Sequence, residues 1–525
     1  MATTNIYDNI PAEKFTFATK NDLGHDKKFD TKPVSYFQGA FRRFRKNKGA
    51  VVGGIVIVFL ILFAIIGPMC TAYTPSYYDE VFAFARPKNN LFANTNFWDG
   101  CREKEVGFIP YIQDYAIGKE TGKNVIKNNE VTISEDGTLY TYRYDTYYGV
   151  GFGKYRLISL DEFNDIQRYQ NETGKQVLYP IVRVSNRPKA KQDVDNANFY
   201  YKTKTEKGKT VPDLDKDGNL VLNYWKYEAG GASPLMAEYN SKRIEGENGI
   251  TGEDGKQYYY AYGRVVSGGV EVRAEYYEYY TYLHSQVLKD GIEEPYFLFG
   301  TTASGKDIFA CLGYGARFSF IFASVVAIVN LIVGAIWGSI SGYFGGKIDL
   351  CMERFSEILG AVPSMIVITL LKYHMGSSSH TIVLFIAFFL TGWIGMASTT
   401  RMQFYRFKNQ EYVLAARTLG ARDTRIMFKH IFPNGLGTIV TRCALVIPSM
   451  IYSETNLSYL GIINLESGNI TSVGTLIAAG QKNVTSAPYI AMFPCVFLVL
   501  LMLSFNLFGN GLRDAFNPSL RGSED

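Results

Sequence analysis

Long apolar runs and one long polar section divide the chain. An uncharged run covers residues 50–69, and five further apolar runs follow in the second half of the sequence. These later runs lie at 318–340, about 355–371, 381–400, about 443–463 and about 487–507. Each is close to the roughly 20 residues that a helix needs to cross a bilayer. The pattern predicts an α-helical integral membrane protein with six transmembrane helices.

The polar section between the first two runs, residues 73–300, predicts a separate folded domain. It contains 28 of the 38 tyrosines and has strand-like alternating runs such as 131–145 and 257–282. Turn signals such as Asp136-Gly137 separate these runs. We expect a β-rich (α+β) domain inserted between the first and second membrane helices. Its tyrosines are typical either of an adhesive binding face or of ordinary strands, and the pattern leaves both open.

The distribution of Lys and Arg sets the expected sidedness. Residues 41–48 are strongly basic and precede the first apolar run, and 399–436 carries seven Lys or Arg. Basic residues gather on the cytoplasmic side of membrane helices. Both termini are therefore expected in the cytoplasm, and residues 73–315 outside the cell. The expected divisions are a cytoplasmic tail at 1–40, the first helix with its basic flank at 41–72, the insertion at 73–300, the other membrane helices at 301–518 and a cytoplasmic tail at 519–525.

Charge and motif content argue against several other functions. The net charge of +5 is spread along the chain, so no nucleic-acid partner is indicated. Among six scattered cysteines, only Cys70 and Cys101 could both lie outside the membrane and form a disulfide. Residues 300–307 imitate a phosphate-binding loop, but Asp307 stands where Ser or Thr would bind magnesium. No paired carboxylates or nucleophile–base pair stand out, so the chain alone is not expected to be an enzyme.

A weak calcium candidate lies within the polar section. Asp213, Asp215 and Asp217 precede Gly218 with the spacing that opens a calcium loop. The twelfth position, where a glutamate is expected, is Tyr224, and strand-like sequence flanks the motif. A tight turn between strands is the alternative, and no other metal site is expected.

The segment 411–434 is basic and amphipathic and lies between two apolar runs. Its small residues share one helical face, which lets another protein approach the backbone closely. Gly420 is expected to end one helix, Asp423 to cap a short second helix and Pro433 to end that helix. The alternative is a basic helix that lies on the membrane surface.

This segment resembles the coupling-helix signature of ABC importer permeases, in which Glu-Ala-Ala is followed by three residues, a Gly and later a Pro. Leu414-Ala415-Ala416 and Gly420 follow that spacing with Leu in place of Glu, and Pro433-Asn434 matches its end. The resemblance implies that this segment binds an ATPase. The residues expected to couple are Glu411, Ala415, Ala416, Arg417, Leu419, Gly420, Arg425 and Pro433.

Other segments are similar to the oligopeptide/dipeptide branch of that family, and in particular to its OppC-like members. They are residues 41–75, 299–309, 342–355 and 504–518. The resemblance covers 41–75 and about 297–518 and says nothing about the large insertion. It implies a six-helix permease of the ABC importer type in the bacterial plasma membrane, with the insertion as an extracellular domain.

The resemblance also implies a function and a set of partners. The chain would form half of the pathway of an ATP-driven oligopeptide importer, with a second, OppB-like permease as the other half. Two cytoplasmic ABC ATPases would bind ATP and magnesium, whereas this chain would bind no cofactor. An extracellular substrate-binding lipoprotein would deliver the peptide.

Two points remain open from the sequence. Glu454 lies inside the fifth apolar run, where a carboxylate is costly and usually faces a bundle interior or a pathway. A hydrogen bond to a neighbouring helix and a role in the pathway or gate are both compatible with it. The alternative functions are a permease for another small solute, such as a dipeptide or nickel, and a membrane-anchored surface protein that acts through its extracellular domain.

Overall fold

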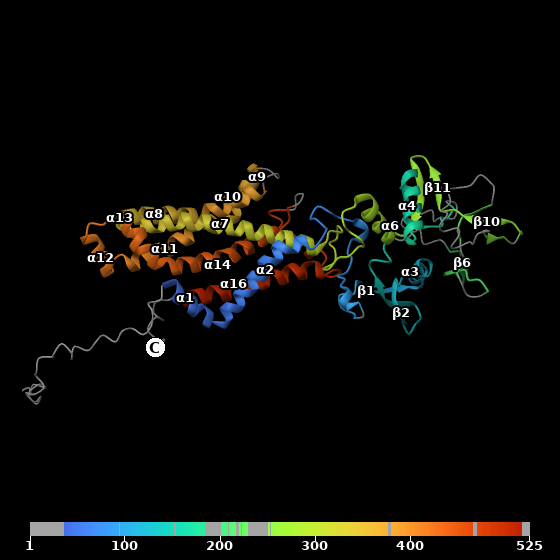
Figure 1. The fold of residues 1–525 in the computed structure, drawn as a ribbon, viewed down its shortest axis with the longest axis horizontal. Coiled ribbons are helices and arrows are strands. Elements are labelled where there is room, and N and C mark those ends of the chain that lie inside the picture. The colour runs from blue at the N-terminus through green and yellow to red at the C-terminus, as the bar shows by residue number, and fades with distance from the viewer. Residues whose placement is uncertain are drawn as a thin grey trace, which may run out of the picture.

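The protein is described from a computed structural model. The structure describes residues 36–516 apart from 94, 152–153, 184–200, 208, 217–219, 222, 229–249, 253, 376–379 and 466–469. A bundle of long helices occupies one end of the molecule and a head of small sheets and short helices occupies the other (Figure 1). The head follows the first membrane helix in the chain and precedes the second, as the polar section predicted.

Within the described residues, five helices are long and apolar enough to cross a membrane, or six if a bent pair counts as one span. The five are α2 with its 3-10 extension (Lys48–Met69), α7 (Ile308–Phe344), α10 with α11 (His380–Phe407), α13 through α14 (Asp423–Tyr459) and α16 (Tyr489–Phe516). Within these, α10 is His380–Gly392, α11 is Ile394–Phe407, α13 is Asp423–Arg425 and α14 is Phe432–Tyr459. Three shorter helices flank them: α1 (Tyr36–Lys46), α12 (Glu411–Thr418) and α15 (Val473–Gln481).

The third predicted span differs from the expectation. Instead of one span at about 355–371, the structure has α8 (Gly346–Gly360) and α9 (Ser364–Met375), which are bent by 67° from one another. The break contains Pro363, and the residue before a proline disfavours the helical conformation. The apolar pattern located this proline inside the span without showing how far the helix turns there.

Three glycines on α7 allow α11 to pack closely against it. A Cβ at Gly334 would lie 2.6 Å from the Met396 Cβ, and one at Gly338 would lie 2.2 Å from the Ala397 carbonyl oxygen. Gly342 continues the same face four residues later, where a Cβ would lie 2.7 Å from the Phe404 Cβ. A repeat of small residues every four positions brings two helix backbones together in membranes. Helices α7 and α11 therefore form the tightly packed centre of the bundle.

The head contains four small antiparallel sheets in the described residues. Their strand orders are β1-β3-β2, β11-β12-β4 with β5 added to β12, β8-β10-β9, and β6-β7. The strands are β1 (Cys101–Gly107), β2 (Ile126–Ile133), β3 (Leu139–Asp145), β4 (Lys154–Ile158), β5 (Leu178–Tyr179), β6 (Thr203–Glu206), β7 (Lys209–Pro212), β8 (Lys226–Glu228), β9 (Ile250–Thr251), β10 (Gln257–Tyr260), β11 (Gly263–Val266) and β12 (Gly269–Ala274). The helices are α3 (Phe108–Thr121), α4 (Leu160–Thr173) and α6 (Tyr276–Tyr282), with single turns at Glu80–Phe82 and Asn90–Phe92 and a π-helical turn at Leu283–Leu288.

Tyrosines form much of the interior of the head. Tyr147, Tyr280 and Tyr282 are almost fully buried, and they belong to one apolar cluster with Phe82 and Phe297. A buried ion pair joins two other parts of the head, since the Arg273 guanidinium binds the Glu120 carboxylate through contacts of 2.7 and 2.5 Å. These tyrosines therefore support packing, but from α6 and from a turn and not from strands. The expectation of a strand at 276–282 was wrong, because this run is buried on every side and lacks the alternation of buried and exposed positions that a strand shows.

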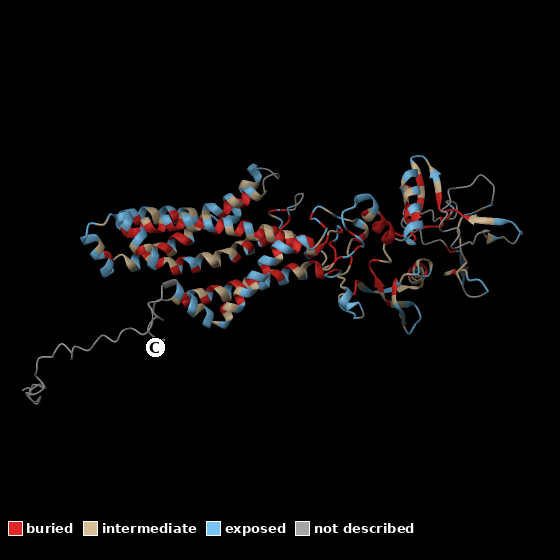
Figure 2. Cartoon of the chain, in the orientation of Figure 1, coloured by how far each residue is buried: buried red, intermediate tan, exposed pale blue. Residues whose placement is uncertain are grey.

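The head is attached to α7 and α16 by close packing. The loop at 300–307 is a tight turn, in which a Cβ at Gly305 would lie 1.8 Å from the Asp79 carbonyl oxygen. Asp307 caps α7 by accepting hydrogen bonds from the backbone amides of Phe309 and Ala310. The segment that imitates a phosphate loop thus begins a membrane helix, and its aspartate satisfies the helix terminus. Buried residues are continuous across this junction (Figure 2).

Candidate coupling site

Helix α12 lies at the end of the bundle away from the head (Figure 1). Only Val413 of its eight residues is buried. Leu414 is 46% exposed, and Leu419, just after the helix, is 88% exposed. An exposed apolar side chain beside small residues is typical of a surface that another protein covers.

Gly420 ends α12 as expected. Its φ of +77° lies in the left-handed region, and the Ala421 amide donates back to the Ala416 carbonyl oxygen at 3.1 Å. This is the common glycine ending of an α-helix. A Cβ at Gly420 would have no neighbour within 4 Å, so the chain leaves open space around this turn.

The two other local expectations for this segment were wrong. Asp423 does not cap α13, because the residue at the N-cap is Arg422 and no side chain caps the helix there. Pro433 does not end a helix either, because it lies in the first turn of α14. A proline is tolerated at that position, where its missing amide would have had no helical partner. A π-helical turn at Ile426–Ile431 joins α13 to α14, so the chain passes directly from the coupling segment into a membrane helix.

A small apolar core supports the coupling segment from beneath. Val413, Ile426 and Ile431 are fully buried there against Tyr343 of α7 and Phe404 of α11. Side chains from α7, α11, α12 and the start of α14 thus share one cluster. A displacement of α12 would have to move that cluster or break it.

Polar contacts also fix the segment to the end of α7. The Tyr343 hydroxyl donates to the Asp423 carboxylate and accepts a hydrogen bond of 3.4 Å from Arg417. Asn434 donates to the Tyr412 hydroxyl at 3.1 Å, which links the end of the segment to its beginning. The side chain of Asp423 therefore holds α7, which explains why it does not cap its own helix.

The predicted coupling residues do not all share one face. Glu411, Ala415, Arg417, Leu419 and Gly420 are exposed on α12 and its turn, and Ala416 is partly buried. Arg425 and Pro433 are exposed on the following helices. The structure thus brings the α12 residues together on one short helix and its turn, and it places Arg425 and Pro433 on the two α-helices that follow.

A charged network beside this site was not found from the sequence. Arg401 of α11 binds the Asp349 carboxylate of α8 through two contacts of 2.6 Å. Tyr405 donates to the same carboxylate at 2.6 Å, and Ser341 of α7 also donates to it. Lys408 donates to the Gly342 carbonyl oxygen at 3.1 Å. In the sequence, the only sign of this network was Asp349, a single aspartate that follows Gly345-Gly346.

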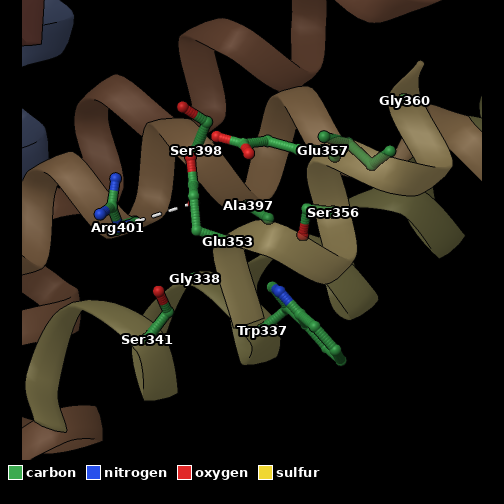
Figure 3. A pocket seen from close by; sticks show the side chains of 11 residues that line it. Trp337, Gly338, Ser341, Glu353, Ser356, Glu357, Gly360, Ala397, Ser398 and Arg401 are labelled. Carbon is green, nitrogen blue, oxygen red and sulfur yellow. Dashed lines mark ion pairs between the residues drawn. The ribbon is translucent and has the colours of Figure 1, made fainter. Parts of the chain in front are cut away.

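The same network borders a cavity of about 210 Å³ between α7, α8 and α11. Figure 3 shows Arg401, Glu353 and Glu357 at its edge, with Trp337 on the α7 side. The Glu353 carboxylate lies 3.7 Å from Arg401, whose guanidinium is already held by Asp349. The cavity therefore combines an apolar wall with a mostly acidic rim.

Glu454 is fully buried where three helices meet. Its carboxylate accepts hydrogen bonds of 3.3 Å from Ser319 of α7 and 3.1 Å from Ser458 of α14. Ser472, at the start of α15, contributes another side-chain hydrogen bond. The carboxylate thus joins α7, α14 and α15, and these contacts satisfy a polar group that would be costly to leave unpaired.

The metal and disulfide candidates gain no support from the geometry. Asp217 lies outside the described residues, and the Asp213 carboxylate lies 4.0 Å from Lys204. Among the residues searched, no group of three His, Cys, Asp or Glu side chains is placed to hold a metal ion. Cys70 and Cys101 are both free thiols in the structure.

Comparison with known proteins matches both ends of the chain. Residues 334–522 match the family described as binding-protein-dependent transport system inner membrane component. Residues 35–90 match the N-terminal transmembrane domain of oligopeptide transport permease C. These two matches leave residues 91–333 outside, which include most of the head.

Individual relatives agree with the family matches. The oligopeptide transport permease OppC of Bacillus subtilis is 44% identical over 42% of this chain and 72% of its own length. The dipeptide transport permease DppC of the same organism is 38% identical over 42% of this chain and 69% of its own. OppC of Escherichia coli K12 is 37% identical over 42% of this chain and 72% of its own length. Among solved structures, the inward-facing methionine ABC transporter MetNI covers 39% of this chain and 96% of its own, with 14% identity and a TM-score of 0.32, which is too low to support an argument.

Proposed function

The chain belongs to the OppC-like permeases of binding-protein-dependent ABC transport systems, and from this premise we propose that it forms half of an oligopeptide import pathway. Such permeases are transport subunits, and ATP is hydrolysed by partner ATPases. The relatives named above carry oligopeptide and dipeptide names, so a peptide cargo is favoured over nickel or another small solute. Competition between unlabelled di-, tri- and pentapeptides for uptake of a labelled peptide would define the preferred length.

The exposed helix α12 is the single observation that carries this proposal. It projects from the end of the bundle away from the head, with apolar Leu414 and Leu419 uncovered. Its buried side is joined to α7 and α11 through Tyr343 and Phe404. One side of the segment is thus free for an ATPase groove while the other side is fixed to membrane helices.

This arrangement supports a mechanical form of coupling. When two ATPase subunits close on ATP and magnesium, the groove that holds α12 moves and carries the helix with it. The Tyr343–Asp423 contact and the apolar core pass that movement to α7 and α14, which tilt relative to the partner permease. Glu411, Ala415, Ala416, Arg417 and Gly420 would contact the ATPase, with Leu419 as the apolar anchor. Arg425 and Pro433 lie outside this contact patch and set the path of the chain behind it.

The sidedness follows from charge. The segment 399–436 carries seven Lys or Arg and 41–48 is basic, and both belong on the cytoplasmic side. The head lies at the opposite end of the bundle, so residues 73–315 would face the exterior and both termini the cytoplasm. A substrate-binding lipoprotein would deliver peptide to the head and the pathway mouth, where a second, OppB-like permease completes the channel.

Glu454, bonded within one chain, would hold helices together rather than contact the cargo.

Gly420→Trp tests the coupling contact. The bulky ring should prevent close approach of the ATPase and reduce peptide uptake at least about tenfold. Because residues other than Gly are strained at positive φ, Gly420→Asn serves as a control that tolerates the left-handed conformation. Gly137→Trp is a second control, since Gly137 has a φ of +69° and open space but lies in a head turn.

Uptake and ATPase co-purification should be measured together in the assembled transporter. Loss of both in Gly420→Trp, with both retained in the two controls, is the expected result. Normal uptake and normal ATPase retention by Gly420→Trp would show that the motor binds elsewhere. An equal loss in Gly420→Asn would show that the turn itself, and not the space around it, is required.

A further inference from the structure

A small apolar surface lies at the base of the head. Leu91 is 87% exposed and Phe97 is 64% exposed, and Phe92 beside them is 36% exposed. The Phe92 and Phe97 rings contact each other with centroids 6.1 Å apart. Three large apolar side chains gathered on one short segment are more than the scattered exposure that is normal on a protein surface.

The segment that carries these side chains is held firmly at its base. The backbones of Lys88 and Asp99 form an antiparallel bridge, and the Asn89 amide donates to the Trp98 carbonyl oxygen at 2.8 Å. The Thr95 hydroxyl bonds to the carbonyl oxygens of Phe92 and Phe97 at 2.8 and 2.7 Å. The described residues that carry the apolar side chains are therefore tied together at the base of the loop.

Aromatic contacts place this loop beside the end of a membrane helix. The Trp98 ring lies 5.7 Å from that of Phe493, which is in the first two turns of α16, and 6.0 Å from that of Phe299. Phe299 contacts Phe309 of α7, and Phe309 contacts Phe63 of α2. In Figure 1 the turn before β1 lies near the head-side end of α16, and in Figure 2 it is exposed.

We infer that Leu91, Phe92 and Phe97 insert into the membrane leaflet that faces the head, where they anchor the head to lipid. Large apolar and aromatic side chains at the level of a helix end are typical of the boundary between acyl chains and headgroups. Two basic side chains fasten the loop from the head side, where both are also ion-paired to the Asp99 carboxylate. Lys127 donates to the Thr95 carbonyl oxygen and Arg143 to that of Asn96.

Lipid fits this surface better than a protein subunit because of what lies next to it. The span that contains α2 is 28% buried within the chain, the lowest share among the five long spans. Its apolar side chains, including Phe59 and Ile66, are exposed. The loop therefore lies at the head end of a bundle whose first span leaves much apolar surface uncovered. This inference depends on the membrane spans alone and not on the coupling site or the direction of transport.

Lipid-bound quenchers test the insertion directly. Leu91→Cys is placed in a chain whose exposed Cys70, Cys351 and Cys495 are replaced by Ser, and the thiol is labelled with an NBD dye. The assembled transporter is reconstituted into phosphatidylcholine/phosphatidylglycerol vesicles with or without 5-doxyl phosphatidylcholine. Leu157→Cys is the matched control, because Leu157 is 58% exposed on β4, whose sheet includes β11 on the side of the head away from the bundle (Figure 1).

The dye at position 91 should be blue-shifted and quenched at least about twofold by the doxyl lipid, whereas the dye at 157 should respond only to aqueous iodide. Quenching of position 91 by iodide and not by doxyl lipid would place the loop in water and overturn the inference. Shielding from both quenchers would place the loop against another subunit and would overturn it equally. Peptide uptake by the labelled transporter checks that assembly is intact, so a coupling defect cannot be mistaken for a failed anchor.

Discussion

At the head end of α7, Asp307 is buried and caps the helix, and the rings of Phe299 and Phe309 pack against neighbouring helices. At the other end, Tyr343 reaches the coupling segment through one hydrogen-bonded aspartate and a small apolar core. The head side of the junction is closed over by its own chain, apart from the exposed loop that carries Leu91, Phe92 and Phe97. The coupling side leaves Leu414 and Leu419 exposed.

This difference shows which region is complete by itself. A domain that buries its own large side chains, as the head does with Tyr147 and Tyr280, gains its stability from internal packing. A helix that exposes apolar side chains next to a left-handed turn gains part of its stability only when a partner covers it. Because α7 has 37 residues and spans about 55 Å, one helix connects a region with large apolar clusters of its own to a segment with a small core and exposed leucines.

The largest expected effect is on the stability of the head and comes from its buried ion pair. Glu120→Ala would leave the Arg273 guanidinium, which is 0% exposed, without its carboxylate partner. Removal of one member of a buried pair typically costs about 3–5 kcal/mol. We expect the head to unfold at lower urea concentration, measured by protease sensitivity of the assembled transporter, while the ATPases remain bound.

Glu271→Ala is the matched control, because the Arg264–Glu271 pair is partly exposed and should contribute less than about 1 kcal/mol. Equal destabilisation by the two variants would mean that the buried ion pair contributes no more to the free energy of unfolding than the partly exposed pair does. Loss of the ATPases from Glu120→Ala would mean that the two regions are not independent.

A smaller and more specific effect is expected at the coupling end. Tyr343→Phe removes the hydroxyl that bonds Asp423 and Arg417 but keeps the ring in its apolar core. Hydrogen bonds to charged groups contribute about 1.5–3 kcal/mol, so α12 should be positioned less firmly. Peptide imported per ATP hydrolysed should fall several-fold, with ATPase binding retained, in proteoliposomes that report both rates.

The control for this change lies at the opposite end of the bundle. The Tyr489 hydroxyl is buried and has no hydrogen-bond partner among the described residues, so Tyr489→Phe removes an oxygen that bonds nothing. It should leave the ratio of uptake to hydrolysis unchanged. An unchanged ratio in Tyr343→Phe as well would show that the apolar core alone positions the coupling segment.

The sequence was informative where a residue has one dominant local effect. Gly420 ends α12 because a left-handed turn favours glycine. Most apolar runs of about 20 residues became long helices, because a helix satisfies its backbone polar groups within one segment. The outcome for Asp423 could not be foreseen, since its partner Tyr343 is 80 residues away in the chain. Pro433 has two common uses near helix ends, and only the path of the chain decides between them.

The head shows the same limit on a larger scale. Alternating runs predicted strands, and antiparallel strands are present, except that 276–282 forms α6. The arrangement of the four small sheets depends on contacts between distant segments such as β4 with β12. The Asp349–Arg401 pair in the bundle likewise joins residues 52 positions apart. No local pattern identifies a pairing of this kind. A resemblance to a family supplies it only where relatives share the segment, and the matches leave most of the head outside.

The smallest expected effect concerns the pH dependence of the head. Burial raises the pKa of Glu275 from 4.5 to about 8, and the nearby Lys123 ammonium, 3.4 Å away, offsets this only in part. Between these two pH values the folded head holds a proton that the unfolded chain releases, so the free energy of unfolding decreases as pH rises. We expect a loss of more than about 1 kcal/mol between pH 5 and about pH 9, measured by urea unfolding of the head in the full transporter.

Glu275→Gln should remove most of this slope, whereas Glu135→Gln, at an exposed turn, should keep it. A parent protein with a head as stable at pH 9 as at pH 5 would show that Lys123 compensates the buried carboxylate completely.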